Sequence, residues 1–350
     1  MELEFLNVLW FVLIAILWTG YLVLEGFDFG VGMLLPVLGK KEKERRLLIN
    51  TIGPLWDGNE VWLLTAGGAT FAAFPEWYAT MFSGFYIPLF IILIALIVRG
   101  ISFEYRAKIE DGNWKRWCDA GIIFGSWVPS ILWGVAFANL VRGVELDANH
   151  QFTGGFFSLL NPFALLGGVV TLLLFLLHGA LFLALKTDGD IRVRANALAG
   201  KFALGSILAA GTWAIWAQVA YGKGWTWIAV IIAAASLVAV YLTNRVGKEG
   251  LAFTFSAVAI VAAVVLIFGS LFPNVMPASN VAENSLNIMN AASTPYTLTV
   301  MSWVAVMLVP LVLAYQAWTI WVFRKRLKVE HIPDAIGLAT LSVPKELLKD

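Results

Sequence analysis

The chain has 350 residues, of which 60% are hydrophobic and 13% are charged, and its formal net charge is +1. Because a soluble globular protein carries about 25% charged residues, this composition excludes that class and indicates an integral membrane protein. The near-neutral charge and the single cysteine, Cys118, give no basis for a nucleic-acid partner or for an internal disulfide.

Nine segments of the sequence have the length and apolar character of membrane-spanning helices, each needing about 20 mostly apolar residues. The first apolar run continues past residue 26, so we expect its helix to extend or bend before Pro36. The nine segments are residues 6–26, 53–73, 78–99, 119–141, 162–185, 202–221, 225–243, 252–271 and 297–323. The sequence therefore predicts an all-α polytopic membrane protein with nine transmembrane helices.

Basic residues alternate sharply between the predicted connections. One set of connections, together with the C-terminal tail, holds 22 of the 24 Lys and Arg residues, and the other set holds only Arg142 and Lys223. Cytoplasmic loops of membrane proteins carry such an excess of Lys and Arg. We therefore expect the N-terminus outside and the C-terminus in the cytoplasm, which agrees with an odd number of spans.

A short internal match suggests a repeat. Leu24-Glu25-Gly26 and Leu177-His178-Gly179 each lie late in an apolar run that ends in a basic loop. On this hypothesis two four-helix units are followed by one extra helix. The predicted divisions are a single transmembrane domain over 1–330, with a first unit over 1–145, a second unit over 155–275 and a ninth helix over 297–325, and then a cytoplasmic tail over 331–350.

Ionisable side chains lie inside the first two predicted spans. Glu25 and Asp28 are three residues apart in the first span, so they share a helix face. Asp57 and Glu60 have the same spacing in the second span. A charge in a span costs about 2.5–3.5 kcal/mol and by default marks a functional site. Because Arg99 ends the third span on the same side, we expect Asp28, Asp57 and Arg99 to form one buried polar cluster near the cytoplasm.

Two interpretations of these acids stay open. In the structural one, Arg99 neutralises an acid and the cluster only holds the helices together. In the functional one, the acids relay protons inward from the cytoplasm, and Asp28 and Asp57 are stronger candidates than Glu25 and Glu60. The side chains expected to support the cluster are Trp56, Asn59, Arg99 and Glu104.

The sequence offers little that could hold a cofactor. Of its three histidines, only His178 lies in a predicted span, and a lone histidine there more often hydrogen-bonds within the bundle than ligates haem. No Cys/His cluster indicates an iron–sulfur or copper centre. We therefore expect this chain to ligate no haem and no metal. Gly26 and Gly30, four residues apart, are expected to allow close helix packing.

Several ordered motifs in the first half resemble subunit II of cytochrome bd-type quinol oxidases. Further matches are Arg99-Gly100, Phe103-Glu104-Tyr105-Arg106 and Gly134-Val135-Ala136-Phe137-Ala138-Asn139, and the second half matches in architecture more than in motif. The leading motifs are Gly26-Phe27-Asp28-Phe29-Gly30-Val31-Gly32, Glu44-Arg45-Arg46, Trp56-Asp57-Gly58-Asn59-Glu60-Val61-Trp62-Leu63, Gly67-Gly68 and Phe71-Ala72-Ala73-Phe74-Pro75.

This resemblance implies a haem-free subunit paired with a haem-bearing subunit I, which holds two b-type haems and haem d. The complex would oxidise quinol and reduce dioxygen to water in the bacterial cytoplasmic (inner) membrane, taking protons from the cytoplasm. Asp28 and Asp57 match proton-path acids, Arg99 matches a polar partner, and Trp62 matches a residue near an oxygen entry. A small single-span subunit is a further candidate partner, and some members hold a structural quinone in subunit II.

Two other functions remain as alternatives at the level of sequence. A proton-coupled secondary transporter would also show a two-fold repeat and buried acids, although the acids here lie in the first half only. A purely structural scaffold would use the acids for packing alone.

Overall fold

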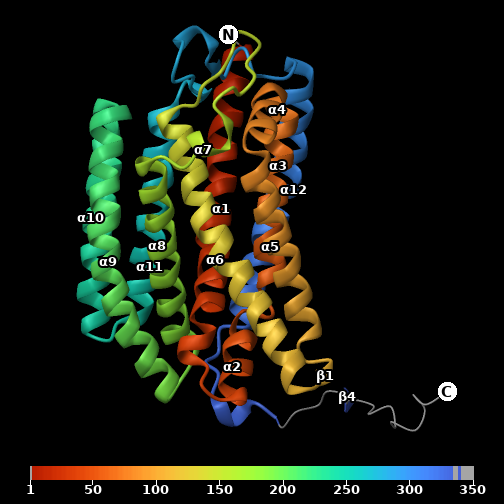
Figure 1. Cartoon of the computed structure of the whole chain (residues 1–350), viewed down its shortest axis with the longest axis vertical. Coiled ribbons are helices and arrows are strands. Elements are labelled where there is room, and N and C mark those ends of the chain that lie inside the picture. Colours follow the sequence, from red (N-terminus) through yellow and green to blue (C-terminus); the bar gives the residue numbers. More distant parts are fainter. Residues whose placement is uncertain (1, 334–337, 340–350) are drawn as a thin grey trace, which may run out of the picture.

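The computed structural model describes residues 2–333 and 338–339, and most of these residues lie in long, roughly parallel helices (Figure 1). The helices are α1 (Glu2–Leu38), α2 (Glu42–Ile52), α3 (Trp56–Ala73), α4 (Pro75–Gly84), α5 (Tyr86–Tyr105), α6 (Gly112–Arg142), α7 (Gly155–Ser158), α8 (Pro162–Lys186), α9 (Asp190–Tyr221), α10 (Trp227–Arg245), α11 (Glu249–Leu271) and α12 (Pro295–Val322). The predicted all-α membrane class is confirmed.

Among the described residues, short strands and 3-10 turns lie in the connections between helices and in the segment after α12. Strand β1 pairs with β4 in parallel, and β2 pairs with β3 in antiparallel orientation. These elements are β1 (Ile109–Glu110), β2 (Asn274–Met276), β3 (Leu286–Asn287), β4 (Leu338–Ala339), η1 (Gly224–Thr226), η2 (Ala282–Asn284) and η3 (Val329–His331). The predicted tail over 331–350 lies mostly outside the described residues.

Within the described part of the chain, eight segments are long and apolar enough to cross a membrane. Eight of the nine predicted spans correspond to these segments, and the first extends well beyond residue 26, with Pro36 inside α1. The remaining predicted span, 53–73, corresponds to the 18-residue helix α3. Its first turns contain Asp57, Asn59 and Glu60, and these polar residues lower the apolar character of a helix that has only 18 residues. The count of nine spans therefore stays a prediction.

The predicted single span over 78–99 is divided in the structure. A break at Phe85 separates α4 from α5, and the Phe85 backbone has left the helical region at φ −100° and ψ 22°. Pro88 provides the physical reason, because proline has no N–H to donate to the carbonyl four residues earlier, at Gly84. The chain therefore bends at this point before continuing as α5.

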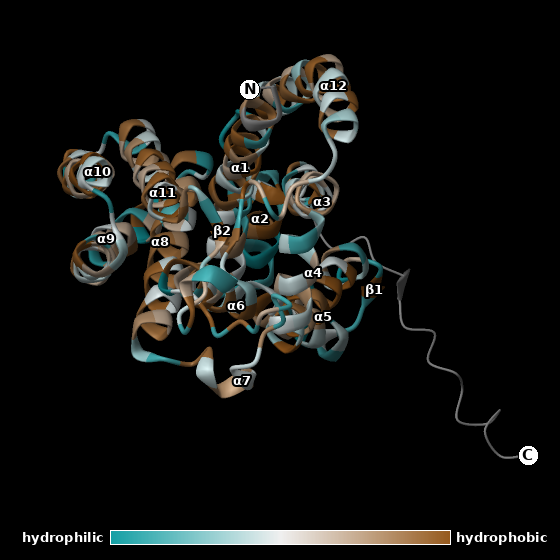
Figure 2. Ribbon diagram, turned by 90° about the horizontal axis from the view of Figure 1, so that it is seen from above, coloured by the Kyte–Doolittle hydropathy of each residue, from teal (hydrophilic) through white to brown (hydrophobic). Residues whose placement is uncertain are grey.

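Helix α1 runs through the centre of the molecule, seen end-on in Figure 2 between the group α8–α11 and the group α3–α5. Its backbone packs directly against the backbone of α8 at Gly30, with no side chain between the two helices. A Cβ atom on Gly30 would lie 2.1 Å from the Phe175 carbonyl oxygen and 2.7 Å from the Gly179 Cα. Such small residues let helix backbones approach closely in membranes. The close packing expected at Gly26 and Gly30 is confirmed, since a Cβ on Gly26 would lie 2.8 Å from the Phe175 ring.

One end of the bundle, called here the basic end, carries α2 and the α1–α2, α5–α6, α8–α9 and α10–α11 connections (Figure 1). Arg106 donates two hydrogen bonds of 2.9 Å to the Glu42 carboxylate and one of 2.6 Å to Asp119. Arg194 on α9 donates to Glu44 at 2.8 Å. Helix α2 is thereby tied to α5 and α6 on one side and to α9 on the other.

Residues 323–327, called here the C-terminal strap, close the basic end of the second half. The Leu327 amide donates to the Lys186 carbonyl at 2.8 Å, and the Asp188 amide donates to the Leu327 carbonyl at 3.1 Å. Lys186 donates from its ammonium to the Phe323 carbonyl. Arg326 pairs with Glu249 at 2.8 Å, so the strap joins the ends of α8 and α11.

Candidate functional site

A cluster of charged and amide side chains lies buried between α1, α3 and α5. Helix α1 places Glu25 and Asp28 on its inner face, and neither side chain is exposed. Arg99 of α5 is also fully buried, and Asn59 of α3 is 1% exposed. These four residues, called here the buried charge cluster, come from three helices that are neighbours in sequence.

The contacts inside the buried charge cluster pair each acid with a different donor. Arg99 Nη1 donates to Glu25 Oε1. Asn59 Nδ2 donates to Asp28 Oδ2 at 2.6 Å. The side chain of Gln316 on α12 donates from Nε2 to Asn59 Oδ1 at 2.8 Å. This last bond leaves the amide nitrogen of Asn59, rather than its oxygen, facing Asp28.

Aromatic rings complete the surroundings of Arg99. Its guanidinium lies 4.6 Å from the ring centroid of Phe29 and 5.2 Å from that of Phe103. A cation over an aromatic face is stabilised electrostatically, by about 2 kcal/mol or more when desolvated. The guanidinium is therefore held by one carboxylate and two rings in a site from which bulk water is excluded.

Several atoms of the buried charge cluster keep hydrogen-bonding capacity. Glu25 Oε2, Asp28 Oδ1, and Nε and Nη2 of Arg99 are buried and have no hydrogen-bond partner among the described residues. Unpartnered buried polar atoms are rare in proteins and call for a specific explanation. Four of them at one place give the cluster acceptors and donors that the helix packing itself does not use.

The expectation that Asp57 joins Asp28 and Arg99 is wrong. Asp57 is exposed, whereas Asn59 two residues later is buried. Helical residues two apart point about 200° away from each other, so α3 can turn only one of these two side chains toward α1. Glu25, which the sequence ranks below Asp57 as a proton-path acid, pairs with Arg99, whereas Asp57 lies outside the buried charge cluster.

The other predicted site residues surround the cluster at different depths. Glu60 is half-buried, and Glu104 is exposed. Trp56 is buried with its ring 5.2 Å from that of Phe103. Trp62 is half-buried and occupies the space beside Gly20, where a Cβ would lie 2.2 Å from the indole ring.

Both ring nitrogens of His178 form hydrogen bonds within the bundle, as the sequence predicts. Its Nδ1 lies 2.6 Å from Ser256 Oγ, and its Nε2 lies 3.1 Å from the Val23 carbonyl oxygen. Neither nitrogen is free to ligate haem iron in this arrangement. Among the residues that the structure describes, no group of three His, Cys, Asp or Glu side chains is placed to hold a metal ion.

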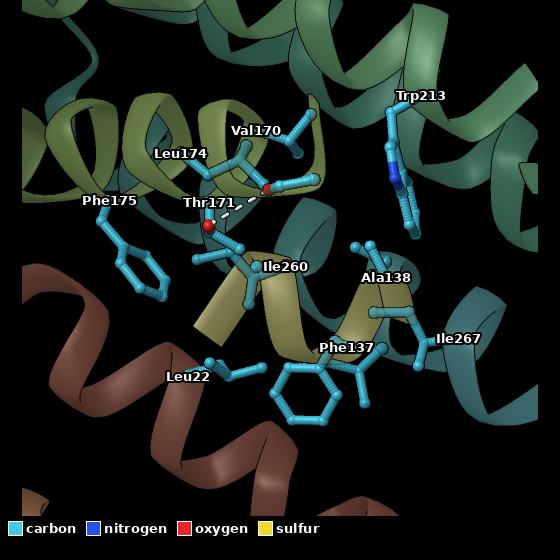
Figure 3. Close-up of a pocket in the computed structure, with 14 residues that line it drawn as sticks. Leu22, Phe137, Ala138, Val170, Thr171, Leu174, Phe175, Trp213, Ile260 and Ile267 are labelled. Atoms are coloured by element: carbon cyan, nitrogen blue, oxygen red, sulfur yellow. Dashed lines mark hydrogen bonds between the residues drawn. The ribbon is translucent and has the colours of Figure 1, made fainter. Parts of the chain in front are cut away.

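Two apolar spaces, an internal cavity and a lateral groove, limit the size of a cofactor that this chain could bind. Figure 3 shows an internal cavity with Phe175 on one side and Trp213 on the other, and its volume is about 40 Å³. A haem or a quinone ring does not fit there. A lateral groove of about 460 Å³ runs beside Gly67 and Gly68, and it is lined mainly by aromatic and aliphatic side chains of α3, α4 and α5.

Gln316 is the site residue that the sequence reasoning missed. It is the single amide side chain within residues 297–323, an otherwise largely apolar segment. The reasoning that drew attention to the acids applies equally to an amide in a span, because a polar group there needs a partner. The identity of that partner, Asn59, could not be read from the sequence.

Comparisons with known proteins agree with one another. A family model described as cytochrome bd terminal oxidase subunit II matches residues 6–323. The chain is 44% identical over 330 residues to a Bacillus subtilis protein named cytochrome bd ubiquinol oxidase subunit 2, covering 92% of this chain and 96% of the relative. It is 38% identical over 370 residues to Escherichia coli cytochrome bd-I ubiquinol oxidase subunit 2, covering 95% and 97%.

A solved structure has the same fold. It is a bd oxidase chain from Geobacillus thermodenitrificans, with a TM-score of 0.72 and 17% sequence identity. The match covers 91% of this chain and 99% of that chain.

Proposed function

Because the chain belongs to the family of cytochrome bd terminal oxidase subunit II, we propose that its buried charge cluster supplies protons to the centre that reduces dioxygen. The chain is a subunit of a quinol-oxidising oxidoreductase complex, and the alternative of a proton-coupled transporter is not favoured. The proposal concerns what this subunit contributes to the complex.

The observation that carries the proposal is the free hydrogen-bonding capacity of buried ionisable groups. Asp28 Oδ1 and Glu25 Oε2 have no partner among the described residues. A carboxylate that only stabilised the helices would use both oxygens, because an unpartnered buried acceptor costs about 1–3 kcal/mol. A proton-transfer group needs an atom within hydrogen-bond reach of the proton, directly or through one water molecule, and these open oxygens provide such atoms.

The acids outside the buried charge cluster provide a proton path from the surface to it. Asp57 and Glu104 are exposed, and Glu60, one turn beyond Asp57 on α3, is half-buried. We assign Asp57 and Glu104 to proton collection, Glu60 to the transition, and Asp28 and Glu25 to the interior. Trp56 and Arg99 then act as positioning residues, and Trp62, whose ring lies beside Gly20 of α1, is assigned to the oxygen entry.

We propose nine spans, with the N-terminus outside and the C-terminus in the cytoplasm of a bacterial inner membrane. The described parts of the chain near its two termini lie at opposite ends of the bundle (Figure 1). The ionic contacts of α2 gather at the basic end, where the positive-inside rule places the cytoplasm. The division into two four-helix units and a ninth helix remains part of this proposal.

We propose that a haem-bearing subunit I docks on the face formed by α3, α5 and α12. Only 6% of the apolar stretch of α12 is buried within this chain, and α5 also presents exposed apolar side chains such as Tyr86 and Ile97. The two b-type haems and haem d belong to that partner, because both nitrogens of His178 are engaged here. A structural quinone would fit the 460 Å³ groove but not the internal cavity.

The test is an Asp28→Asn variant of the whole purified complex, with oxygen consumption measured with quinol and haem content measured from the reduced spectrum. We expect oxygen consumption to fall at least about tenfold at unchanged haem content. Glu76→Gln is the matched control, because Glu76 is an exposed acid at the start of α4 and lies outside the buried charge cluster. If Asp28→Asn kept full activity, Asp28 would not supply protons and the scaffold role would be favoured. If Asp28→Asn lost haem, Asp28 would be required for the structure of the complex instead.

A further inference from the structure

Arg142 is an exception to the charge distribution of this chain. It and Lys223 are the two basic residues in the connections at the end of the bundle opposite the basic end. Lys223 lies 5.6 Å from the Phe272 ring centroid. Arg142 is exposed at the C-terminal end of α6, and no described residue forms a hydrogen bond or an ion pair with its side chain. A guanidinium kept at this disfavoured end without a partner in the chain suggests a ligand.

Arg142 lines a polar cavity of about 270 Å³ together with Glu145. Glu145 is also exposed, and no ion pair within the described residues joins the two charges. The cavity is about nine times the roughly 30 Å³ that a water molecule occupies in the liquid, so it accommodates a small polar group. One wall bears a cation and another bears an anion, and the two charges give the site no net charge.

The backbone that carries these charges is fixed from both sides. The Val144 amide donates to the Pro277 carbonyl at 3.0 Å, and the Ser279 amide donates to the Val144 carbonyl at 2.9 Å. The Thr153 amide donates to the Glu145 carbonyl at 3.0 Å. A binding site whose walls are already ordered pays less conformational entropy on binding.

The two amide side chains that line the cavity form hydrogen bonds that hold its wall in place. Asn139 Nδ2 donates to the Leu159 carbonyl at 2.8 Å, and Asn161 Nδ2 donates to Asn139 Oδ1 at 2.8 Å. Asn161 Oδ1 accepts from the Ala164 amide at 3.0 Å and caps α8. The two asparagines thus build the wall, while the two charged side chains are left for a ligand.

The cavity lies at the ends of two candidate membrane spans, so we place it where the membrane hydrocarbon ends. The span in α6 ends at Arg142, and the span in α8 begins at Pro162, directly after Asn161. Phe157 of α7 also lines the cavity and is 83% exposed. Aromatic side chains settle at membrane–water interfaces. A ligand here would have its polar group in the cavity and its apolar part beside Phe157.

We propose that this cavity binds the headgroup of a zwitterionic phospholipid carrying a primary ammonium group. Arg142 holds the phosphate, since a guanidinium offers paired N–H donors that match phosphate oxygens. Glu145 accepts hydrogen bonds from the ammonium and disfavours a headgroup that carries only negative charge. Helix α7 and helix α12 lie at opposite edges of the bundle in Figure 2, so a lipid here does not compete with a partner on α12.

The test uses the complete purified complex, delipidated by detergent washing and titrated separately with phosphatidylethanolamine, phosphatidylglycerol and inorganic phosphate. Bound lipid is counted by native mass spectrometry. We expect phosphatidylethanolamine to bind at least about tenfold more tightly than phosphatidylglycerol. Arg142→Gln should weaken phosphatidylethanolamine binding about tenfold, and Glu145→Gln should abolish the preference between the two lipids.

Lys223→Gln is the matched control, because Lys223 lies at the same end of the bundle but does not line the cavity. It should bind both lipids as the unchanged complex does. Equal binding of the two lipids by the unchanged complex would overturn the zwitterionic assignment. Unaltered binding in Arg142→Gln would overturn the site itself. Displacement of the lipid by equimolar inorganic phosphate would identify a free-anion site instead.

Discussion

Removal of Arg99 is the sharpest test of how the buried charge cluster is held. Arg99 and Glu25 are both fully buried and pair with each other. In Arg99→Met the carboxylate of Glu25 loses its counter-charge, while Phe29 and Phe103 lose the cation between them. Breaking a buried ion pair from one side costs about 3–5 kcal/mol, which is about a 150- to 5,000-fold change in an equilibrium constant.

The matching double variant, Glu25→Leu with Arg99→Met, removes both charges together. Replacing a buried pair by apolar side chains of similar volume is often neutral or stabilising. We therefore expect the double variant to be more stable than Arg99→Met. The assay is the temperature at which half of the purified complex loses its haem or dissociates, measured for both single variants and the double variant.

The surface pair Arg192–Glu249 provides the control, because Arg192 is 38% exposed and Arg326 also binds Glu249. Arg192→Met should cost no more than about 1 kcal/mol. If Arg99→Met were as stable as Arg192→Met, leaving Glu25 without its buried partner would not cost the expected amount of about 3–5 kcal/mol. If the double variant were both stable and fully active with quinol and oxygen, proton supply through Glu25 would be refuted.

Three further predictions concern packing, positioning and pH. Gly30→Val should prevent assembly of the complex, because a Cβ there would meet the α8 backbone. Gly211→Ala should assemble normally, since nothing lies within 4 Å of its Cβ position and α9 is not part of the face proposed for subunit I. The amount of haem-containing complex recovered from membranes measures both. Gln316→Leu should lower oxygen consumption several-fold and alter its pH profile at constant haem content, because the amide facing Asp28 loses its orienting donor; an unchanged profile would contradict this. Partial burial acts to raise the pKa of the Glu42 carboxyl, but hydrogen bonds from Arg106 prevail and lower it below its ordinary value of 4.5. Its stabilisation is therefore present above about pH 4.5 and lost as the pH falls through the lowered pKa, so Glu42→Gln should be less stable than the unchanged complex at pH 7 and nearly equal to it at low pH in thermal unfolding.

The sequence predicts the helical membrane class well, because a long apolar run is a direct physical requirement for crossing hydrocarbon. It also marks Gly30 and His178 correctly. It does not predict the break at Phe85, since Pro88 lies inside a run that is apolar throughout and hydropathy carries no information on backbone geometry.

The membership of the buried charge cluster is predicted only in part. Spacing of three residues shows that Asp57 and Glu60 share a face, but it does not show which face of α3 meets α1. The buried positions Trp56 and Asn59 settle the orientation, and they require tertiary contacts that a single sequence does not contain. The same holds for Gln316, whose partner is 257 positions away.

The C-terminal strap has a consequence for the order in which the chain is completed during synthesis. The carbonyl of Lys186 and the carboxylate of Glu249 accept hydrogen bonds from Leu327 and Arg326, which are synthesised well after α8 and α11. The ends of α8 and α11 at the basic end therefore lack these contacts until the C-terminal strap has been synthesised. A chain cut short before Arg326 would keep the helices up to α12 but lack these contacts, so the basic end of its second half would remain open.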